Sequence, residues 1–330
     1  MGAPALSPAF VTGGSGFIGG ALVRRLVAAG TPVRALARSA RSADAVAGLG
    51  AEPVRGDLGD PASLAAGAEG CEVAYHLAAH LGQWGTREEF VRGNVTGTEN
   101  ALEASRRAGV RRFVHCGTEA GVLVGEALVD ADETLPLRPD SRVLYSATKA
   151  MAEQAVRTAN RDGLETVVLR PRLVWGEGDT TLLPEFVAAA ESGKLVWIAG
   201  GRHLTATTHV ENVVEGLLLA AEKGLPGEAY FVTDGEPIEF RAFVTELLAT
   251  QGTEAPTRSV PAWAGAGLAA AGEAAWRLLP LRGEPPLTRL AFWLWAKECT
   301  IDISKARAEL GYEPVIDRER GMAELRAAAA

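Results

Sequence analysis

A glycine-rich segment near the N-terminus constrains the fold of this chain more than any other feature. Residues 12–19 read Thr-Gly-Gly-Ser-Gly-Phe-Ile-Gly and lie between a short apolar run, residues 9–12, and an amphipathic stretch, residues 17–29. Glycines at this spacing between a strand and a helix let the backbone approach a pyrophosphate, whose charge is favoured at the helix N-terminus. The pattern predicts a dinucleotide site; the alternative is a tight turn without a ligand.

The remainder of the first 170 residues alternates short strand-like runs with helical patterns, which is typical of βαβ units. Strands are predicted at residues 9–12, 33–37, 52–55, 73–77, 112–116 and 166–169, and helices at 17–29, 91–108 and 146–160. A helix at 210–222 and a strand at 229–232 indicate a return to the same sheet.

We therefore expect an α/β fold with a doubly wound parallel-sheet Rossmann domain and a smaller, mainly helical C-terminal substrate lobe. The Rossmann domain is expected to comprise residues 1–171 and about 209–234, and the substrate lobe about 172–208 and 235–330.

Composition excludes several classes of function. The 330 residues carry 33 Lys and Arg against 41 Asp and Glu, a net charge of −8, which argues against nucleic acid as a partner. Three scattered cysteines and five histidines show neither a disulfide framework nor metal-ligand spacing, so no metal is expected. Residues 1–23 lack both charge and a basic leader and contain six glycines, so we expect a cytoplasmic protein without an integral membrane segment.

The end of the second predicted strand bears on the choice of cofactor. NAD-binding versions of this unit place an acidic residue there for the adenosine ribose, whereas this chain has Arg38. A guanidinium can hold a 2′-phosphate through charge-assisted hydrogen bonds, so NADP(H) is favoured, while NAD(H) remains open. Asp57, after the third strand, is placed to meet the adenine edge; alternatively, it caps the helix beginning near Pro61.

Tyr145 and Lys149 give the strongest chemical signal. Four residues apart on a helix, they share one face. A nearby ammonium favours the phenolate and lowers the pKa of the tyrosine, which suits a general acid that protonates a carbonyl oxygen. An exposed helix pair is the alternative, but the position downstream of the glycine loop and the predicted strands favours the catalytic interpretation.

These segments together resemble the extended short-chain dehydrogenase/reductase family. The matching pieces are residues 12–19, Asp57, residues 76–79 (His-Leu-Ala-Ala), Asn94, Tyr145 with Lys149, and residues 169–171. The resemblance implies that Tyr145 is the general acid/base, that Lys149 binds the nicotinamide ribose, and that Thr118 replaces a catalytic serine. The cofactor contacts it implies are Gly13, Gly16, Phe17, Ile18, Gly19, Arg38, Asp57, Leu58, Leu77, Ala78, Ala79, Lys149 and Pro171.

Within that family, residues 170–179, 182–184 and 208–214 are most similar to the 3β-hydroxysteroid dehydrogenase branch, which includes sterol-4-carboxylate 3-dehydrogenases and 2-alkyl-3-oxoalkanoate reductases. The branch implies a homodimer and a small apolar ketone or alcohol as substrate. The predicted substrate contacts are Leu81, Trp84, Thr118 and Trp175. Four C-terminal tryptophans either line the same cleft or belong to the core or an interface, namely Trp263, Trp276, Trp293 and Trp295.

The leading hypothesis is an NADP(H)-dependent oxidoreductase that interconverts a ketone and a secondary alcohol on a steroid-like or long-chain 3-oxoacyl substrate. A nucleotide-sugar epimerase or dehydratase with retained NAD is the alternative, although Arg38 argues against it. A protein that binds the cofactor without catalysis is disfavoured by the presence of Thr118, Tyr145 and Lys149.

Overall fold

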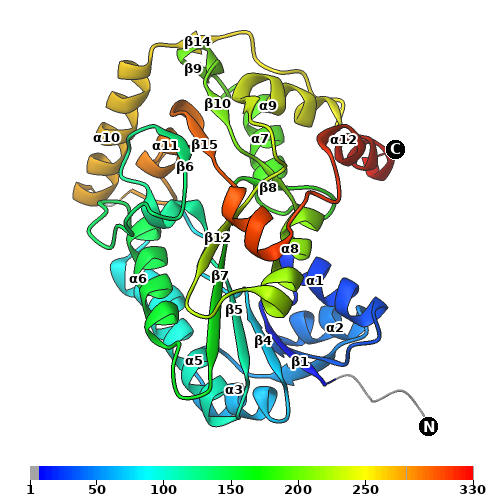
Figure 1. Ribbon diagram of the computed structural model, residues 1–330. Helices are drawn as coiled ribbons and strands as arrows, with labels where there is room; N and C mark the ends of the chain where they lie inside the picture. Colours follow the sequence, from blue (N-terminus) through cyan, green and yellow to red (C-terminus); the bar gives the residue numbers. More distant parts are fainter. Residues whose placement is uncertain (1–6, 280, 330) are drawn as a thin grey trace.

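A seven-stranded parallel sheet forms the centre of the molecule (Figure 1), in a computed structural model that describes residues 7–279 and 281–329. The strand order is β12-β7-β5-β4-β1-β2-β3. The strands are β1 (Ala9–Thr12), β2 (Val33–Ala37), β3 (Glu52–Arg55), β4 (Val73–His76), β5 (Arg112–Cys116), β7 (Glu165–Pro171) and β12 (Ala229–Val232). The order reverses between β1 and β4, and ligands of such sheets bind at the carboxyl ends of the strands at this point.

Helices cover both faces of the sheet, because its strands bury alternate side chains on opposite sides. Val11 and Val114 pack in one core with helices α1 (Phe17–Ala28) and α8 (Val210–Lys223). Phe10 and Phe113 pack in the other. That second core includes side chains from α3 (Pro61–Ala68), α5 (Gly97–Arg107) and α6 (Leu144–Thr158). The predicted doubly wound α/β fold is confirmed, including the return of residues 229–232 to the sheet.

The predicted helix at residues 91–108 is interrupted. Its sequence forms a short helix α4 (Arg87–Phe90), a π-helical turn η1 (Val91–Thr96) and then α5. π-Helical turns inside longer helices occur frequently at functional sites. Here the turn carries Asn94, whose contacts are described below.

A second, four-stranded sheet in the order β13-β10-β15-β6 lies above the first (Figure 1). Its strands are β6 (Leu128–Ala131), β10 (Leu204–Thr205), β13 (Ile238–Glu239) and β15 (Cys299–Ile301). This sheet was not predicted, because three of its strands have only two or three residues and because its strands come from distant parts of the chain. The helices of this part are α7 (Leu182–Glu191), α9 (Phe240–Ala249), α10 (Ala262–Leu278) and α11 (Arg289–Ala296).

No helix within the described residues is both long and apolar enough to span a lipid bilayer.

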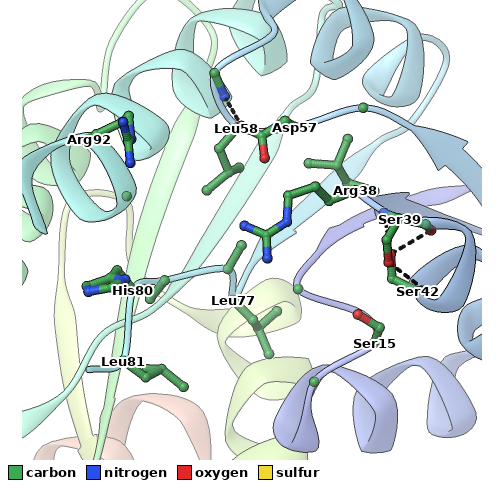
Figure 2. A pocket seen from close by; sticks show the side chains of 18 of the residues that line it. Ser15, Arg38, Ser39, Ser42, Asp57, Leu58, Leu77, His80, Leu81 and Arg92 are labelled. Atoms are coloured by element: carbon green, nitrogen blue, oxygen red, sulfur yellow. Dashed lines mark hydrogen bonds between the residues drawn. The ribbon is translucent and has the colours of Figure 1, made fainter. Parts of the chain in front are cut away.

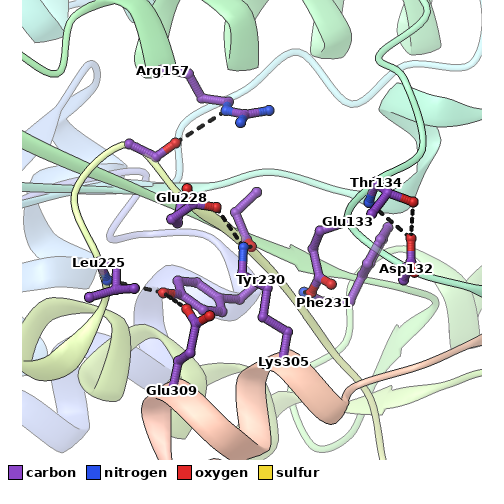
Figure 3. A network of polar contacts seen from close by, with 12 residues as sticks. Asp132, Glu133, Thr134, Arg157, Leu225, Glu228, Tyr230, Phe231, Lys305 and Glu309 are labelled. Atoms are coloured by element: carbon purple, nitrogen blue, oxygen red, sulfur yellow. Dashed lines mark hydrogen bonds and ion pairs between the residues drawn. The ribbon is translucent and has the colours of Figure 1, made fainter.

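The C-terminal segment returns to the central sheet after β15. Lys305 donates to the carboxylate of Glu228 at 2.6 Å, and the hydroxyl of Tyr230 donates to Glu309 at 2.6 Å (Figure 3). These contacts cover strand β12, which lies at the edge of the sheet. Tyr312 is fully buried in the core that includes α1 and α8. This part of the chain therefore packs against the central sheet; the division into a Rossmann domain and a substrate lobe stays a prediction.

Candidate active site

The glycine loop after β1 is shaped by close backbone contacts. Gly13 has a φ of +77°, and a Cβ there would lie 2.7 Å from the amide nitrogen of Ala78. A Cβ on Gly19 would overlap the carbonyl oxygen of Gly13. No side chain caps helix α1 at Gly16, so its first amide groups are left for another acceptor. These features fit a pyrophosphate at the start of α1.

An open groove of about 610 Å³ runs from this loop across the carboxyl ends of β1–β4 (Figure 2). Eight of the predicted cofactor residues line it: Gly13, Gly16, Arg38, Asp57, Leu58, Leu77, Ala78 and Ala79. Five do not line it: Phe17, Ile18, Gly19, Lys149 and Pro171. Gly19 acts through its close contact with the loop, and Lys149 lies farther along the strand ends, beside β5.

Arg38 lies at the end of β2, and its guanidinium points into the groove (Figure 2). Ser39 and Ser42 line the groove beside it and cap helix α2 (Ala40–Gly48) reciprocally. A cation next to a helix N-terminus is a suitable environment for a phosphate group. Neither serine was predicted, although a serine shortly after a predicted strand is a recognisable signal for the start of a helix.

Asp57 lines the groove but does not cap a helix. Its Oδ1 accepts a hydrogen bond from the amide of Gly59 at 2.9 Å, while Asp60 caps α3. The alternative role that we considered for Asp57 therefore belongs to Asp60. Arg92, from the π-helical turn, also lines the groove and was not predicted (Figure 2).

Asn94 connects the groove to the catalytic helix. Its Oδ1 accepts from the backbone amide of His80 at 2.7 Å, and its Nδ2 donates to the hydroxyl of Thr148 at 3.1 Å. Thr148 precedes Lys149 on α6. The buried amide of Asn94 thus fixes the segment after β4 relative to the helix that carries the tyrosine and lysine.

Tyr145, Lys149 and Thr118 come together at the carboxyl end of β5. Lys149 is 5% exposed and its Nζ donates to the carbonyl oxygen of Cys116 at 3.1 Å. Tyr145 and Thr118 are partly buried, and Thr118 lies close enough to Tyr145 to affect the ionisation of its phenol. The structure therefore brings the three predicted catalytic side chains together.

The predicted lowering of the tyrosine pKa is wrong for the protein alone. Burial, followed by the nearby charge of Glu119, raises the pKa of Tyr145, and burial lowers that of Lys149. Lys149 binds the Cys116 carbonyl instead of approaching the phenol closely enough to outweigh these effects. Tyr145 is consequently protonated at neutral pH, which is the state that a general acid needs.

The predicted substrate residues differ in their surroundings. Leu81 is 60% exposed and lines the groove. Trp84 is partly buried beneath the guanidinium of Arg277 from α10. Trp175 is fully buried, and its indole donates to Asp234 at 2.8 Å. The prediction that Trp175 lines an open cleft is wrong, because its ring fills the core.

The four C-terminal tryptophans also differ in how far they are exposed to solvent. Trp263 is 78% exposed, whereas Trp276, Trp293 and Trp295 are partly buried. Trp295 packs on Phe186 of α7, with ring centroids 5.4 Å apart.

A family model described as "3-beta hydroxysteroid dehydrogenase/isomerase family" matches residues 10–262. The chain belongs to this family. This membership confirms the resemblance and the expectation of a dehydrogenase or reductase that acts on CH–OH groups.

Named relatives cover almost the whole chain. A 4-hydroxy-2-methyl-3-oxo-4-farnesyl-3,4-dihydroquinoline-1-oxide ketoreductase of Stigmatella aurantiaca is 46% identical, over 97% of this chain and 96% of that protein. A 2-alkyl-3-oxoalkanoate reductase of Stenotrophomonas maltophilia is 38% identical over 97% of this chain and 98% of that protein.

The fold of this chain is also similar to that of solved structures. A dTDP-glucose 4,6-dehydratase of Streptomyces venezuelae with bound NAD superposes with a TM-score of 0.74, over 97% of this chain and 95% of that one. At 24% identity, that structure supports the extended Rossmann fold alone.

Proposed function

We propose that this member of the 3-beta hydroxysteroid dehydrogenase/isomerase family is an NADP(H)-dependent reductase that interconverts a ketone and a secondary alcohol on an apolar, long-chain or polycyclic substrate. The observation that carries the proposal is the position of Tyr145, Lys149 and Thr118 at the end of β5, beside the groove that begins at the glycine loop.

The chemistry follows from the protonation states of these side chains. When bound, the nicotinamide supplies or accepts the hydride. Tyr145, protonated at neutral pH, donates its hydroxyl proton to the oxygen of the ketone, and in the reverse direction takes it from the alcohol. Lys149 carries a buried amino group that would hold the ribose near the end of β5.

The preference for NADP(H) rests on Arg38. Its guanidinium points into the groove and makes no ion pair within the described chain, so it is available for a phosphate. The adjoining Ser39 and Ser42 place two hydroxyl groups at the same end of the groove, while their backbone amides are used in the reciprocal cap of α2. No acidic side chain takes the position after β2 where an NAD-binding protein would hold the ribose.

The choice of an apolar substrate is supported by the relatives and by the groove. The relatives' names specify a farnesylated quinoline derivative and 2-alkyl-3-oxoalkanoates. In this chain, exposed Leu81 lies at the end of the groove, and Trp84 follows on the same loop. Apolar side chains at this place favour an apolar ligand.

The test is oxidation of NADPH in the presence of a panel of ketones: 2-alkyl-3-oxo acids, 3-oxosteroids and alkylated quinolones. We expect ketone-dependent oxidation of NADPH, and a fall in kcat of about 10³-fold in Tyr145→Phe with unchanged affinity for NADPH, because the proton donor alone is lost. Lack of turnover with every ketone, combined with epimerisation of a nucleotide sugar or loss of water from it, would replace this proposal by the epimerase or dehydratase hypothesis.

A further inference from the structure

Glu119 places a carboxylate next to the catalytic side chains, in the 3₁₀ helix η2 (Glu119–Val122). Its side chain is 4% exposed. One carboxylate oxygen accepts a hydrogen bond from the hydroxyl of Thr118 at 2.7 Å, and the other accepts one from the guanidinium of Arg172 at 2.6 Å. Burial of a carboxylate charge is unfavourable unless the charge is paired. The ion pair with Arg172 compensates for the burial of Glu119.

Arg172 connects this carboxylate to the part of the chain above the central sheet. Its side chain is 1% exposed. It donates to the hydroxyl of Thr205 in β10 and to the carbonyl oxygen of Leu294 in α11, each at 3.3 Å. The Glu119–Arg172 ion pair therefore connects the end of β5 to β10 and α11, which belong to the predicted substrate lobe.

The hydrogen bonds around Thr118 restrict what its hydroxyl group can do. Its single proton is given to Glu119, and its oxygen accepts from the amide of Ala120 at 3.3 Å. Thr118 also lies close enough to Tyr145 to affect the ionisation of its phenol. While its proton is directed to Glu119, Thr118 can only accept hydrogen bonds from further partners and has no proton left for the substrate oxygen.

We propose that Glu119, held by Arg172, is a positioning residue of the reductase site that orients the Thr118 hydroxyl and keeps Tyr145 in its protonated form. The inference rests on the proposed function and deepens it, since it gives Thr118 the role of supporting Tyr145 rather than of binding the substrate directly. Glu119 itself makes no contact with the reacting atoms in this scheme.

The charged and titratable groups around Tyr145 come from four elements. Glu119 lies on η2, Cys116 on β5, Lys149 on the same helix as Tyr145, and Arg172 follows β7. Of these, Glu119 is the group whose negative charge most disfavours the phenolate, whereas burial raises the pKa of the Cys116 thiol to about 11 and leaves it neutral at neutral pH. Removal of the Glu119 charge should accordingly make Tyr145 easier to deprotonate.

The decisive experiment measures the pH dependence of alcohol oxidation in Glu119→Gln. The substrate is the alcohol product of the best ketone in the panel, with saturating NADP⁺. Because oxidation requires deprotonated Tyr145, kcat/KM rises with pH until that group has ionised. We expect the pH of half-maximal kcat/KM to fall by about one unit or more in the variant. A profile identical to that of the unaltered protein would overturn the proposal.

Two variants separate positioning from general destabilisation. In Glu119→Gln/Arg172→Met both charges are absent, so we expect a smaller shift than in the single variant. In Glu273→Gln, which removes a buried carboxylate paired with Arg289 of α11, the profile should stay unchanged. A shift of equal size in Glu273→Gln would contradict a specific role for Glu119.

Separate results would contradict the proposed function and the proposed role of Glu119. Full activity in Tyr145→Phe would overturn the proposed function and this inference together, whereas an inactive Tyr145→Phe with an unshifted Glu119→Gln would overturn the inference alone. If Glu119→Gln does not fold, Glu119→Asp keeps the charge but shortens the reach to Thr118. We expect its kcat to fall about tenfold with an unchanged half-maximal pH; an unaltered kcat would refute the positioning role.

Discussion

The two sides of the site are assembled in different ways. The nucleotide groove is lined entirely by residues between Gly13 and Gly93, and each segment lies at the carboxyl end of one of the strands β1–β4 or in the loop and helix that follow it. The polar contacts behind Thr118 instead join residues 53 and 122 positions apart, from Arg172 to Glu119 and to Leu294. The groove is thus specified by local sequence, whereas the substrate side depends on long-range packing.

The largest effect on the local side is expected in Gly19→Ala. Its Cβ would overlap the carbonyl oxygen of Gly13, so the loop must move away from the position that fits a pyrophosphate. We expect affinity for NADPH to fall by about 100-fold, or ~2.7 kcal/mol, in a fluorescence titration. Gly20→Ala is the matched control, because the nearest atom to its Cβ lies at 3.7 Å. Equal losses of NADPH affinity in both variants would show that the close contact between Gly19 and the glycine loop does not determine nucleotide binding.

Among the effects on nucleotide binding, that of Arg38→Ala is expected to be the next largest, and this substitution removes a single functional group. Loss of the guanidinium should weaken NADPH binding by tenfold or more, ~1.4 kcal/mol, and leave NADH binding unchanged. Arg41→Ala removes an exposed cation of the same helix region that does not line the groove, and should have no such effect. A proportional loss for both nucleotides in Arg38→Ala would contradict recognition of a 2′-phosphate.

A pH-dependent prediction concerns the strand ends beneath the catalytic residues. His115 is buried, stacks on His76, and neither of its ring nitrogens has a hydrogen-bond partner within the described chain. Burial, followed by the charge of Lys149, holds its pKa well below the ordinary value of 6.5. The unfolded chain therefore binds a proton that the folded protein does not, and stability falls as the pH drops below about 6.5.

His115→Phe removes this proton uptake with a ring of similar shape. Between pH 7 and pH 5, the free energy of unfolding should fall by about 2 kcal/mol less in the variant than in the unaltered protein. Urea unfolding at the two pH values measures the difference. An identical loss in both proteins would show that His115 is protonated in the fold.

The smallest effect is expected in Gly267→Ala on helix α10. The space around its Cβ is open, so the substitution should only improve helix propensity and raise the free energy of unfolding by about 0.5–1 kcal/mol. Thermal unfolding gives the change, and catalysis should be unaffected. A loss of activity would show that α10 must be flexible or that it approaches the substrate.

The same contrast explains what the sequence could predict. Gly13, Gly16, Arg38 and the strands β1–β5 are recognisable because turn chemistry, strand periodicity and a catalytic pair at helical spacing are properties of neighbouring residues. Glu119 was missed although it follows Thr118, because its role appears only with its distant partner Arg172.

Trp175 was misplaced for a related reason. Sequence gives no indication that the ring packs on Phe243 and donates to Asp234. Its burial depends on side chains from other elements, as the second sheet depends on pairing between strands too short to recognise.

The most direct test of the account is a comparison of NADPH and NADH binding by the purified protein, after any retained nucleotide has been identified and removed. We predict an exchangeable site that binds NADPH at least tenfold more tightly than NADH, ~1.4 kcal/mol, and that supports ketone-dependent oxidation of the bound NADPH. Tightly retained NAD, with no preference for NADPH and no turnover of ketones, would contradict the account.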